Sequence, residues 1–279
     1  MSIEIVTTSS SDISQELAQE LGITVIPHEI AFGDKTYIDG VDILPDEFYA
    51  RLKESPQIPT TSAVTPGPFA QAYNGLAEKT DEILCIVLSS GLSVTYDAAL
   101  KAREGVKRKG VRIEVIETLG VAGGVGLIVL EALKAVKAGE TLDTIVEMVK
   151  RDVPRCYVRI CLDTLEYLHK GGRIGRVQAL MGSLLNIKPI LESRGTFQPI
   201  ARVRSHAKVL EHLYEYIGSF KKINSMSLQY TDNKPNVEAL ADRVSEFFPR
   251  DRINIWPLTP VCGTHAGPGS IVASVIGDR

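Results

Sequence analysis

The sequence lacks the features of an exported or membrane-spanning protein. Its first residues, MSIEIVTTSS, contain neither a basic segment nor a long apolar core, so they do not predict a signal peptide. No apolar run reaches the ~18 residues that a membrane-spanning helix needs. The longest candidate, residues 120–139, is rich in glycine and contains Glu131 and Lys134. We therefore expect a cytoplasmic protein without a transmembrane segment.

Metal-like cysteine spacings and long runs of like charge are also missing. Cys156 and Cys161 form the one near pair among four cysteines, and in a strand their side chains would lie on opposite faces. We expect reduced thiols, no bound metal and no cofactor. The formal net charge is -3, from 31 basic and 34 acidic residues, and the densest basic stretch, 101–110, is short. The charge therefore argues against a nucleic-acid partner.

The first half of the chain has the pattern of an α/β domain. At roughly 150 residues per domain, a length of 279 residues suggests about two domains, although a single large one is also compatible with it. Strand-like runs at 3–8, 82–88 and 111–118 alternate with helical segments, which favours βαβ units around a parallel sheet. A further strand-like run covers 23–32. We predict an N-terminal three-layer α/β/α domain over residues 1–155.

The pattern changes after Pro154. The apolar runs become shorter and more alternating, and helical segments fall near 205–220 and 235–248. This pattern predicts a two-layer α+β domain with a mixed or antiparallel sheet over residues 156–279. The domain contains two glycine-rich loops, KGGRIG and HAGPG. The fold class as a whole is therefore α/β with two domains.

Polar turns follow three of the predicted parallel strands. They read TTSSSD, SSGLS and ETLG, and open parallel sheets bind ligands at the carboxyl ends of their strands. Hydroxyl groups beside helix N-terminal amides suit a carboxylate or a phosphate, although the same residue types also cap helices. For TTSSSD, capping is the better explanation. For SSGLSVT, which has four hydroxyls in seven residues, we favour contact with a ligand.

Ser93 raises the question of nucleophilic catalysis. The surrounding GLSVT is close to the G-x-S-x-G turn that carries the serine of α/β-hydrolases, and His265 is late enough in the chain to be its base. However, Val94 and Thr95 stand where that strained turn needs small residues, and there is no glycine run for an oxyanion hole. A serine hydrolase using Ser93 and His265 is therefore kept only as an alternative.

The two glycine-rich loops carry further candidates. HKGGRIGR, at 169–176, lacks the P-loop spacing, but its glycines permit a tight turn and Arg173 offers a charged fork for a carboxylate or phosphate. His265 lies in the second loop, HAGPGS. Arg202 and Arg204 share one face of a predicted strand, where both can be solvated. From the residues alone, a structural role is the better explanation for each.

Taken in order, these blocks resemble the DegV family, the fatty-acid-binding carrier subunits of bacterial fatty acid kinase. The similar blocks run along nearly the whole chain: IVTTSSSDI, YIDGVDI, PTTS, LSSGLSVTYDAA, LEYLHKGGRIG, LLNIKPIL, GTFQPIARVRS and HAGPG. The pair KGGRIG and IKPIL and the serine block are the most distinctive. The resemblance implies two α/β domains that hold a long-chain fatty acid in a buried tunnel, with no catalysis by this chain alone.

The resemblance also implies residue roles. Four side chains would lie at the fatty-acid carboxylate: Thr61, Ser62, Ser93 and His265. Two arginines would present the head group to a partner, the kinase catalytic subunit that makes the acyl phosphate: Arg173 and Arg202. Transient contact with a membrane surface is a further expectation. Neutral hydroxyl donors suit this task because they avoid burying a full ion pair. The glycines of VAGGVG suit either the close passage of an aliphatic chain or helix–sheet packing.

The chain departs from the family pattern near the expected head group. Thr8 stands where the family usually has Asp, Ala63 changes TSQP to TSAV, and Val94 replaces a glycine after the serine. We expect the pocket shape to differ there. Two alternatives follow: another acyl or isoprenoid acid, or a small ketone bound covalently through a histidine, as in dihydroxyacetone-kinase-like subunits. A long apolar tunnel would exclude the ketone, and a small polar cavity would favour it.

Overall fold

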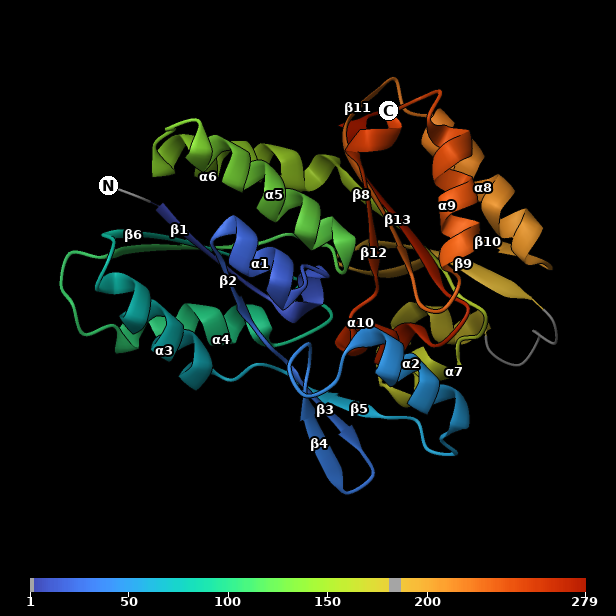
Figure 1. Ribbon diagram of the computed structural model, residues 1–279, viewed down its shortest axis with the longest axis horizontal. Helices are drawn as coiled ribbons and strands as arrows, with labels where there is room; N and C mark the ends of the chain where they lie inside the picture. Colours follow the sequence, from blue (N-terminus) through green and yellow to red (C-terminus); the bar gives the residue numbers. More distant parts are fainter. Residues whose placement is uncertain (1–2, 181–186) are drawn as a thin grey trace.

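A computed structural model of the protein describes residues 3–180 and 187–279 (Figure 1). Its first sheet is parallel and four-stranded, in the order β2-β1-β6-β7. The strands are β1 (Ile3–Thr8), β2 (Ile23–Ile26), β6 (Glu82–Val87) and β7 (Arg112–Glu117). Along β1, Ile5 packs into the core on one face and Val6 into the core on the other, as a sheet covered on both faces requires.

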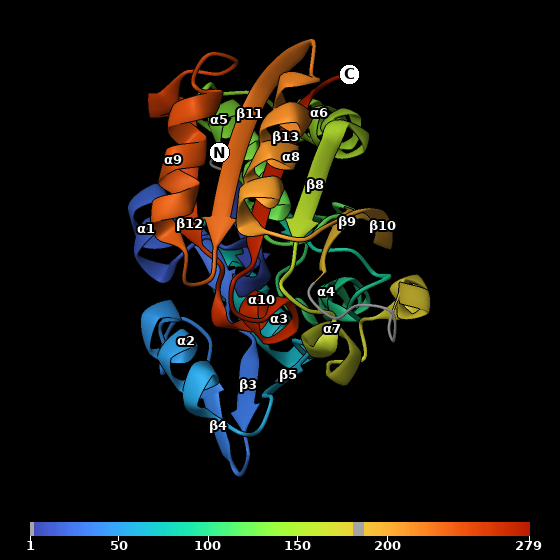
Figure 2. The same cartoon turned by 90° about the vertical axis from the view of Figure 1, so that its right-hand side faces the viewer.

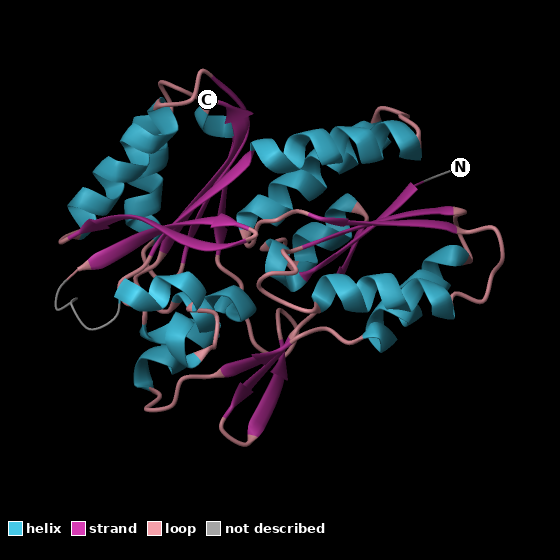
Figure 3. Ribbon diagram, turned by 180° about the vertical axis from the view of Figure 1, so that it is seen from behind, coloured by secondary structure: helices cyan, strands magenta, loops and turns pink. Residues whose placement is uncertain are grey.

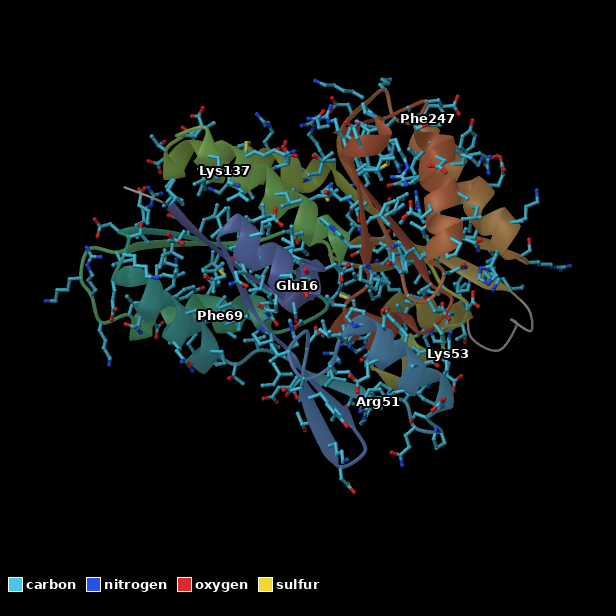
Figure 4. The ribbon with its side chains drawn as sticks, in the orientation of Figure 1. Glu16, Arg51, Lys53, Phe69, Lys137 and Phe247 are labelled. Carbon is cyan, nitrogen blue, oxygen red and sulfur yellow. The ribbon has the colours of Figure 1, made fainter. Side chains whose placement is uncertain are left out.

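Helices cover both faces of this sheet (Figure 3). One face carries α1 (Gln15–Leu21), α5 (Gly123–Lys137) and α6 (Leu142–Asp152), and the other carries α3 (Pro66–Ala77) and α4 (Thr95–Ala102). Phe69 on α3, labelled in Figure 4, is fully buried in the core of the second face. The predicted three-layer α/β/α arrangement is confirmed.

The second sheet is six-stranded and mixed, in the order β10-β9-β8-β13-β11-β12. Its strands are β8 (Cys156–Cys161), β9 (Lys188–Arg194), β10 (Thr196–Val203), β11 (Lys222–Tyr230), β12 (Ile253–Pro257) and β13 (Ile271–Asp278). β11 and β12 run parallel, and the other neighbouring pairs run antiparallel. α8 (His206–Gly218) and α9 (Lys234–Val244) cover one face. The predicted α+β layer is confirmed, although residues 184–186 of the LLNIKPIL block lie outside the described residues.

α5 also reaches the other face of the second sheet, where it contacts β8, β11 and β13 (Figure 1). Its glycines permit this close approach: a Cβ at Gly123 would collide with the Gln229 side chain, and one at Gly124 would collide with Val158. The glycines of VAGGVG therefore serve helix–sheet packing. Because α5 packs on both sheets, the division between residues 155 and 156 stays a prediction.

A third sheet, antiparallel and in the order β4-β3-β5, projects from the body of the molecule (Figure 2). It comprises β3 (Glu29–Phe32), β4 (Lys35–Ile38) and β5 (Thr60–Ser62), with α2 (Pro45–Glu54) beside it. α10 (Pro260–Ala266) contacts β3, β5, α2 and α7 (Glu166–Lys170). The single strand expected over 23–32 is wrong. The chain leaves the first sheet at Pro27, which has no N–H to continue the ladder, and begins β3 at Glu29.

Within the described ranges, no helix is long and apolar enough to cross a membrane. Those ranges also contain no group of three or more His, Cys, Asp or Glu side chains placed to hold a metal ion. The four cysteines are free thiols. Burial raises the pKa of Cys85, Cys156 and Cys161 to about 12, so these thiols stay protonated at neutral pH.

Candidate functional site

A pocket lies at the carboxyl ends of the parallel strands, between them and the second sheet. Every strand of the first sheet contributes to it through the loop that follows: Ser10 after β1, His28 after β2, Ser93 after β6 and Ala122 after β7. This is the edge at which open parallel sheets bind ligands, as the polar turns predict.

The walls of the pocket are mostly apolar. The second sheet contributes Ile160, Leu191 and Val272 from the face opposite α8 and α9, and the loop after β6 adds Leu88 and Leu92. An aliphatic chain suits such a lining, because each buried CH₂ group contributes roughly 0.8 kcal/mol. A small polar ketone does not, because the apolar walls offer it no hydrogen bonds. The geometry therefore favours a lipid-like ligand over the ketone.

One end of the pocket is polar and centres on His265. The side chain comes from α10, and its Nε2 lies 2.8 Å from Oγ1 of Thr61 on β5, a residue 204 positions away in the chain. Burial, with the charge of Arg173, lowers the pKa of His265 to about 3, so the ring is neutral at pH 7. Its Nδ1 lies against Gly171, where a Cβ would overlap the ring. Gly171, the first glycine of KGGRIG, thus makes room for the histidine.

Arg173 brings a fixed positive charge to the same end of the pocket. Its Nε donates to the carbonyl oxygen of Leu92 at 3.3 Å, and its Nη1 donates to that of Gly171 at 2.8 Å. The turn that carries it needs Gly172, whose φ is 71°. Two backbone carbonyls therefore hold the guanidinium against the loop of Ser93, where Arg173 lines the pocket.

Ser93 both lines the pocket and supports the start of α4. Its Oγ accepts the N–H of Thr95 at 3.3 Å and lies 2.8 Å from Oγ1 of Thr95. A hydroxyl has one hydrogen and two lone pairs, so these contacts still leave Ser93 able to take part in a further hydrogen bond. Capping and ligand contact, the two explanations weighed for this block, are therefore compatible with each other.

Glu117, at the end of β7, fixes the loop that carries Ser93. Its Oε1 accepts the N–H of Ser90 at 2.6 Å and the hydroxyl of Ser90 at 2.8 Å. On its other side the loop packs on the β9–β10 turn, because a Cβ at Gly91 would collide with the carbonyl of Gly195. The sequence places Glu117 in a polar turn at a strand end, but it does not show that the glutamate serves the neighbouring loop.

The hydrolase alternative finds no support in these contacts. A serine nucleophile needs a base within hydrogen-bond reach. Nε2 of His265 is instead bonded to Thr61, and the hydroxyl of Ser93 is bonded to Thr95. A histidine whose pKa is held at about 3 is also a weak base for catalysis near neutral pH.

The other residues singled out from the sequence fall at different places. Ser62 and Ala63 line the pocket beside Thr61. Thr8 is fully buried, and its Oγ1 lies 2.8 Å from Oγ of Ser10, so it orders the first polar turn. Val94 is 63% exposed and does not line the pocket within the described residues. The altered pocket shape expected from it therefore has no structural basis.

Arg202 is the predicted head-group residue that the fold does not bring to the others. It is exposed on β10 opposite Pro189 of β9, and it is not among the described residues that line the pocket. Thr61, Ser62, Ser93, Arg173 and His265 do line it together. Any role of Arg202 therefore lies on the outer surface, away from the pocket wall.

Two buried carboxyl groups anchor α10, the helix that carries His265. Oδ1 of Asp12 accepts the N–H of Thr259 at 3.0 Å and its hydroxyl at 2.9 Å, and Oδ2 of Asp39 accepts the N–H of Val261 at 3.3 Å. Burial raises the pKa of each carboxyl to about 7. Both residues lie in segments noted in the sequence, TTSSSD and YIDGVDI. Their role at α10 could not be predicted, because their partners lie over 200 positions away.

Fold and pocket together define a two-domain α/β protein whose apolar pocket ends in hydroxyl, imidazole and guanidinium groups. The chain belongs to the DegV family: the model of that family, described as an uncharacterised protein of the DegV family, matches residues 2–278. A DegV domain-containing protein of Caldanaerobacter subterraneus subsp. tengcongensis is 34% identical over 270 residues, which cover 95% of each chain.

Solved structures of the family have the same fold. A DegV family protein from Thermus thermophilus, described for its fatty acid binding, is 31% identical with a TM-score of 0.89, over 99% of this chain and 100% of that one. DegV from Bacillus subtilis, described as a fatty acid binding protein, is 25% identical with a TM-score of 0.87, over 100% of both chains. The family resemblance and the fold class predicted from the sequence are confirmed.

Asp12→Asn tests the anchor of α10 through its pH dependence. Between the ordinary pKa of 3.8 and the raised value of about 7, Asp12 is protonated in the folded state and ionised in the unfolded state. Its contribution to stability is therefore lost as the pH rises through this range. Asparagine has no such proton. The free energy of unfolding of the variant should therefore rise relative to that of the wild type by up to about 1.4 kcal/mol per pH unit between about pH 5 and 7.

Urea unfolding of both proteins at several pH values measures this difference. The control is Asp34→Asn, a matched change at an exposed carboxyl. Its free energy of unfolding should depend on pH as that of the wild type does. If the difference in free energy of unfolding between Asp12→Asn and the wild type stays constant with pH, this account of the anchor is contradicted.

Proposed function

We propose that this protein binds a long-chain fatty acid and acts as a carrier, not as an enzyme. The observation that carries the proposal is the form of the pocket, which is apolar along its walls and ends in Thr61, Ser93, His265 and Arg173. The relatives from Thermus thermophilus and Bacillus subtilis, both described as binding fatty acids, support it. The acyl chain would lie against Ile160 and the other apolar wall residues, with the carboxylate at the polar end.

The chemistry of the polar end suits a carboxylate. Thr61 and Ser93 offer hydroxyl donors, and the neutral ring of His265 is bonded to Thr61, so that the two groups form a short hydrogen-bonded chain. Hydrogen bonds to an ionised acceptor are stronger than those between neutral groups. Arg173 adds one positive charge, which offsets the cost of burying the negative one. An isoprenoid acid would satisfy the same donors, so the pocket selects for an acidic lipid.

We further propose that the carrier presents the carboxylate to a fatty acid kinase catalytic subunit, which phosphorylates it to an acyl phosphate. Hydroxyl donors leave a carboxylate oxygen able to act as the phosphoryl acceptor. Arg173 would lie beside that oxygen, and the exposed Arg202 on β10 would contact the kinase. The unpaired thiols are typical of the reducing cytoplasm, where we place this exchange, with transient contact at a membrane surface to load the lipid.

Mass spectrometry of the natively purified protein tests the lipid. Denaturation should release a long-chain acid in near-equimolar amount, because a pocket lined mostly by apolar side chains is costly to leave exposed to water. Delipidated protein should take up added palmitate to the same level. Protein that is reproducibly empty, and that also fails to bind added acid, would refute the proposed function.

Ser93→Ala tests the hydroxyl donor. A buried hydrogen bond to a charged group is worth roughly 1.5–3 kcal/mol, so the Kd for palmitate should rise about ten- to a hundredfold. Thr95→Val is the matched control, because it removes the hydrogen bond between the two hydroxyls and leaves the Ser93 hydroxyl, with its bond to the Thr95 N–H, in place. Fluorescence titration should show near-wild-type affinity for the control. Equal losses in the two variants would mean that Ser93 only supports α4.

Arg202→Ala tests presentation to the kinase. The side chain is exposed and does not line the pocket, so palmitate affinity should stay at the wild-type value while phosphorylation by the kinase subunit slows. Arg204→Ala removes the next exposed arginine of the same segment and should leave the rate unchanged. A normal rate in Arg202→Ala would remove this residue from the kinase-contacting surface.

A further inference from the structure

His28 is a second buried histidine at the polar end of the pocket, and neither the family motifs nor the hydroxyl pattern points to it. It lies between β2 and β3, next to Pro27, where the chain passes from the first sheet to the third. Its side chain lines the pocket together with Thr61, Arg173 and His265, and the residue is only 4% exposed. A polar ring in this position is buried at considerable cost unless its nitrogens are satisfied.

One nitrogen of the ring is satisfied by Ser9, in the turn after β1. The backbone N–H of His28 donates to Oγ of Ser9 at 3.1 Å, and the same Oγ lies 3.2 Å from Nδ1 of His28. The hydroxyl has one hydrogen, which can be donated to Nδ1 of His28 or to the Asp39 carboxyl that Ser9 also contacts, and the Nε2–H tautomer requires the first of these. Nδ1 is then an acceptor, and the ring proton of the neutral histidine lies on Nε2.

The ring of His28 carries no charge near neutral pH. Burial, with the charge of Arg173, lowers the pKa of His28 to about 4, so the ring stays neutral at pH 7. His28 and His265 both line the pocket. A neutral ring can offer this end of the pocket either an N–H donor or a lone pair. A bound carboxylate has only acceptor oxygens, so the N–H is the complementary choice.

We propose that His28 is a head-group-binding residue, whose Nε2–H donates to the bound carboxylate and whose tautomer is set by Ser9. This inference rests on the proposed function and adds a donor to Thr61, Ser93 and Arg173. A carboxylate has about four lone-pair sites, so it can accept from all of these groups at once. The consequence is selectivity for the ionised acid over neutral lipids of equal chain length, because bonds to a charged acceptor are the stronger ones.

His28→Leu and His28→Gln, titrated with palmitate and with methyl palmitate, test the contact. His28→Leu should weaken palmitate binding about ten- to a hundredfold, as expected for one lost bond to a charged group, and should change methyl palmitate binding far less. His28→Gln restores an N–H donor and should recover most of the palmitate affinity. A structural role alone would weaken both ligands equally, and that result, or unchanged palmitate affinity in His28→Leu, would overturn the proposal.

The tautomer is tested on the folded wild-type protein, so the answer does not depend on a variant that folds poorly. ¹⁵N NMR of the histidine side chains should show His28 as the Nε2–H form, with the Nε2 resonance shifting when palmitate is added. Ser9→Ala should weaken this preference. The rival arrangement turns the Ser9 hydroxyl toward the Asp39 carboxyl and leaves Nδ1 protonated, and finding that form would overturn the assignment. Wild-type protein that binds no acid would instead refute the proposed function itself.

Discussion

The pocket depends on the contact between Asp12 and Thr259, which joins the first polar turn of the chain to the start of α10. The two residues are 247 positions apart, and both hydrogen bonds lie in the interior, where they are shielded from competing water. A buried carboxyl is costly unless it is hydrogen-bonded, and here it accepts the first free N–H and the hydroxyl at the helix N-terminus. Asp39 accepts the N–H of Val261 in the first turn of the same helix. α10, and with it His265, is therefore positioned by residues that follow β1 of the first sheet and β4 of the third.

The arrangement of polar and apolar groups in the pocket results from the way the first and second sheets meet. The parallel strands end against the open face of the second sheet, so polar turns meet a surface made of Ile160, Leu191 and Val272. The same boundary between polar loops and an apolar sheet gives one pocket two kinds of lining. An amphipathic ligand matches both linings, whereas a wholly polar ligand would make no apolar contacts with the sheet face. Arg173 supplies a single charge, held by backbone carbonyls in place of a partner carboxylate, which leaves it available to a ligand.

The sequence predicts the fold well because hydrophobic period and polar turns are local signals. The change after Pro154 marks the passage to the second sheet, and the turn at Ser93 lies at the expected strand end. The contact between Thr61 and His265 requires the tertiary fold, since the two residues are 204 positions apart and neither local segment specifies the other. Without the family resemblance they would not be paired. His28 is missed because an apolar run over 23–32 predicts one continuous strand, and the break at Pro27 turns its side chain into the pocket.

A crystal structure of the protein with a long-chain acid bound tests the central claim most directly, because it shows which end of the ligand meets which lining. The account predicts that the carboxylate lies within hydrogen-bond reach of Thr61 and Ser93, beside Arg173, and that the chain runs along Ile160 and Leu191. A ligand with its carboxylate away from these groups, or one bound outside the pocket, would contradict it.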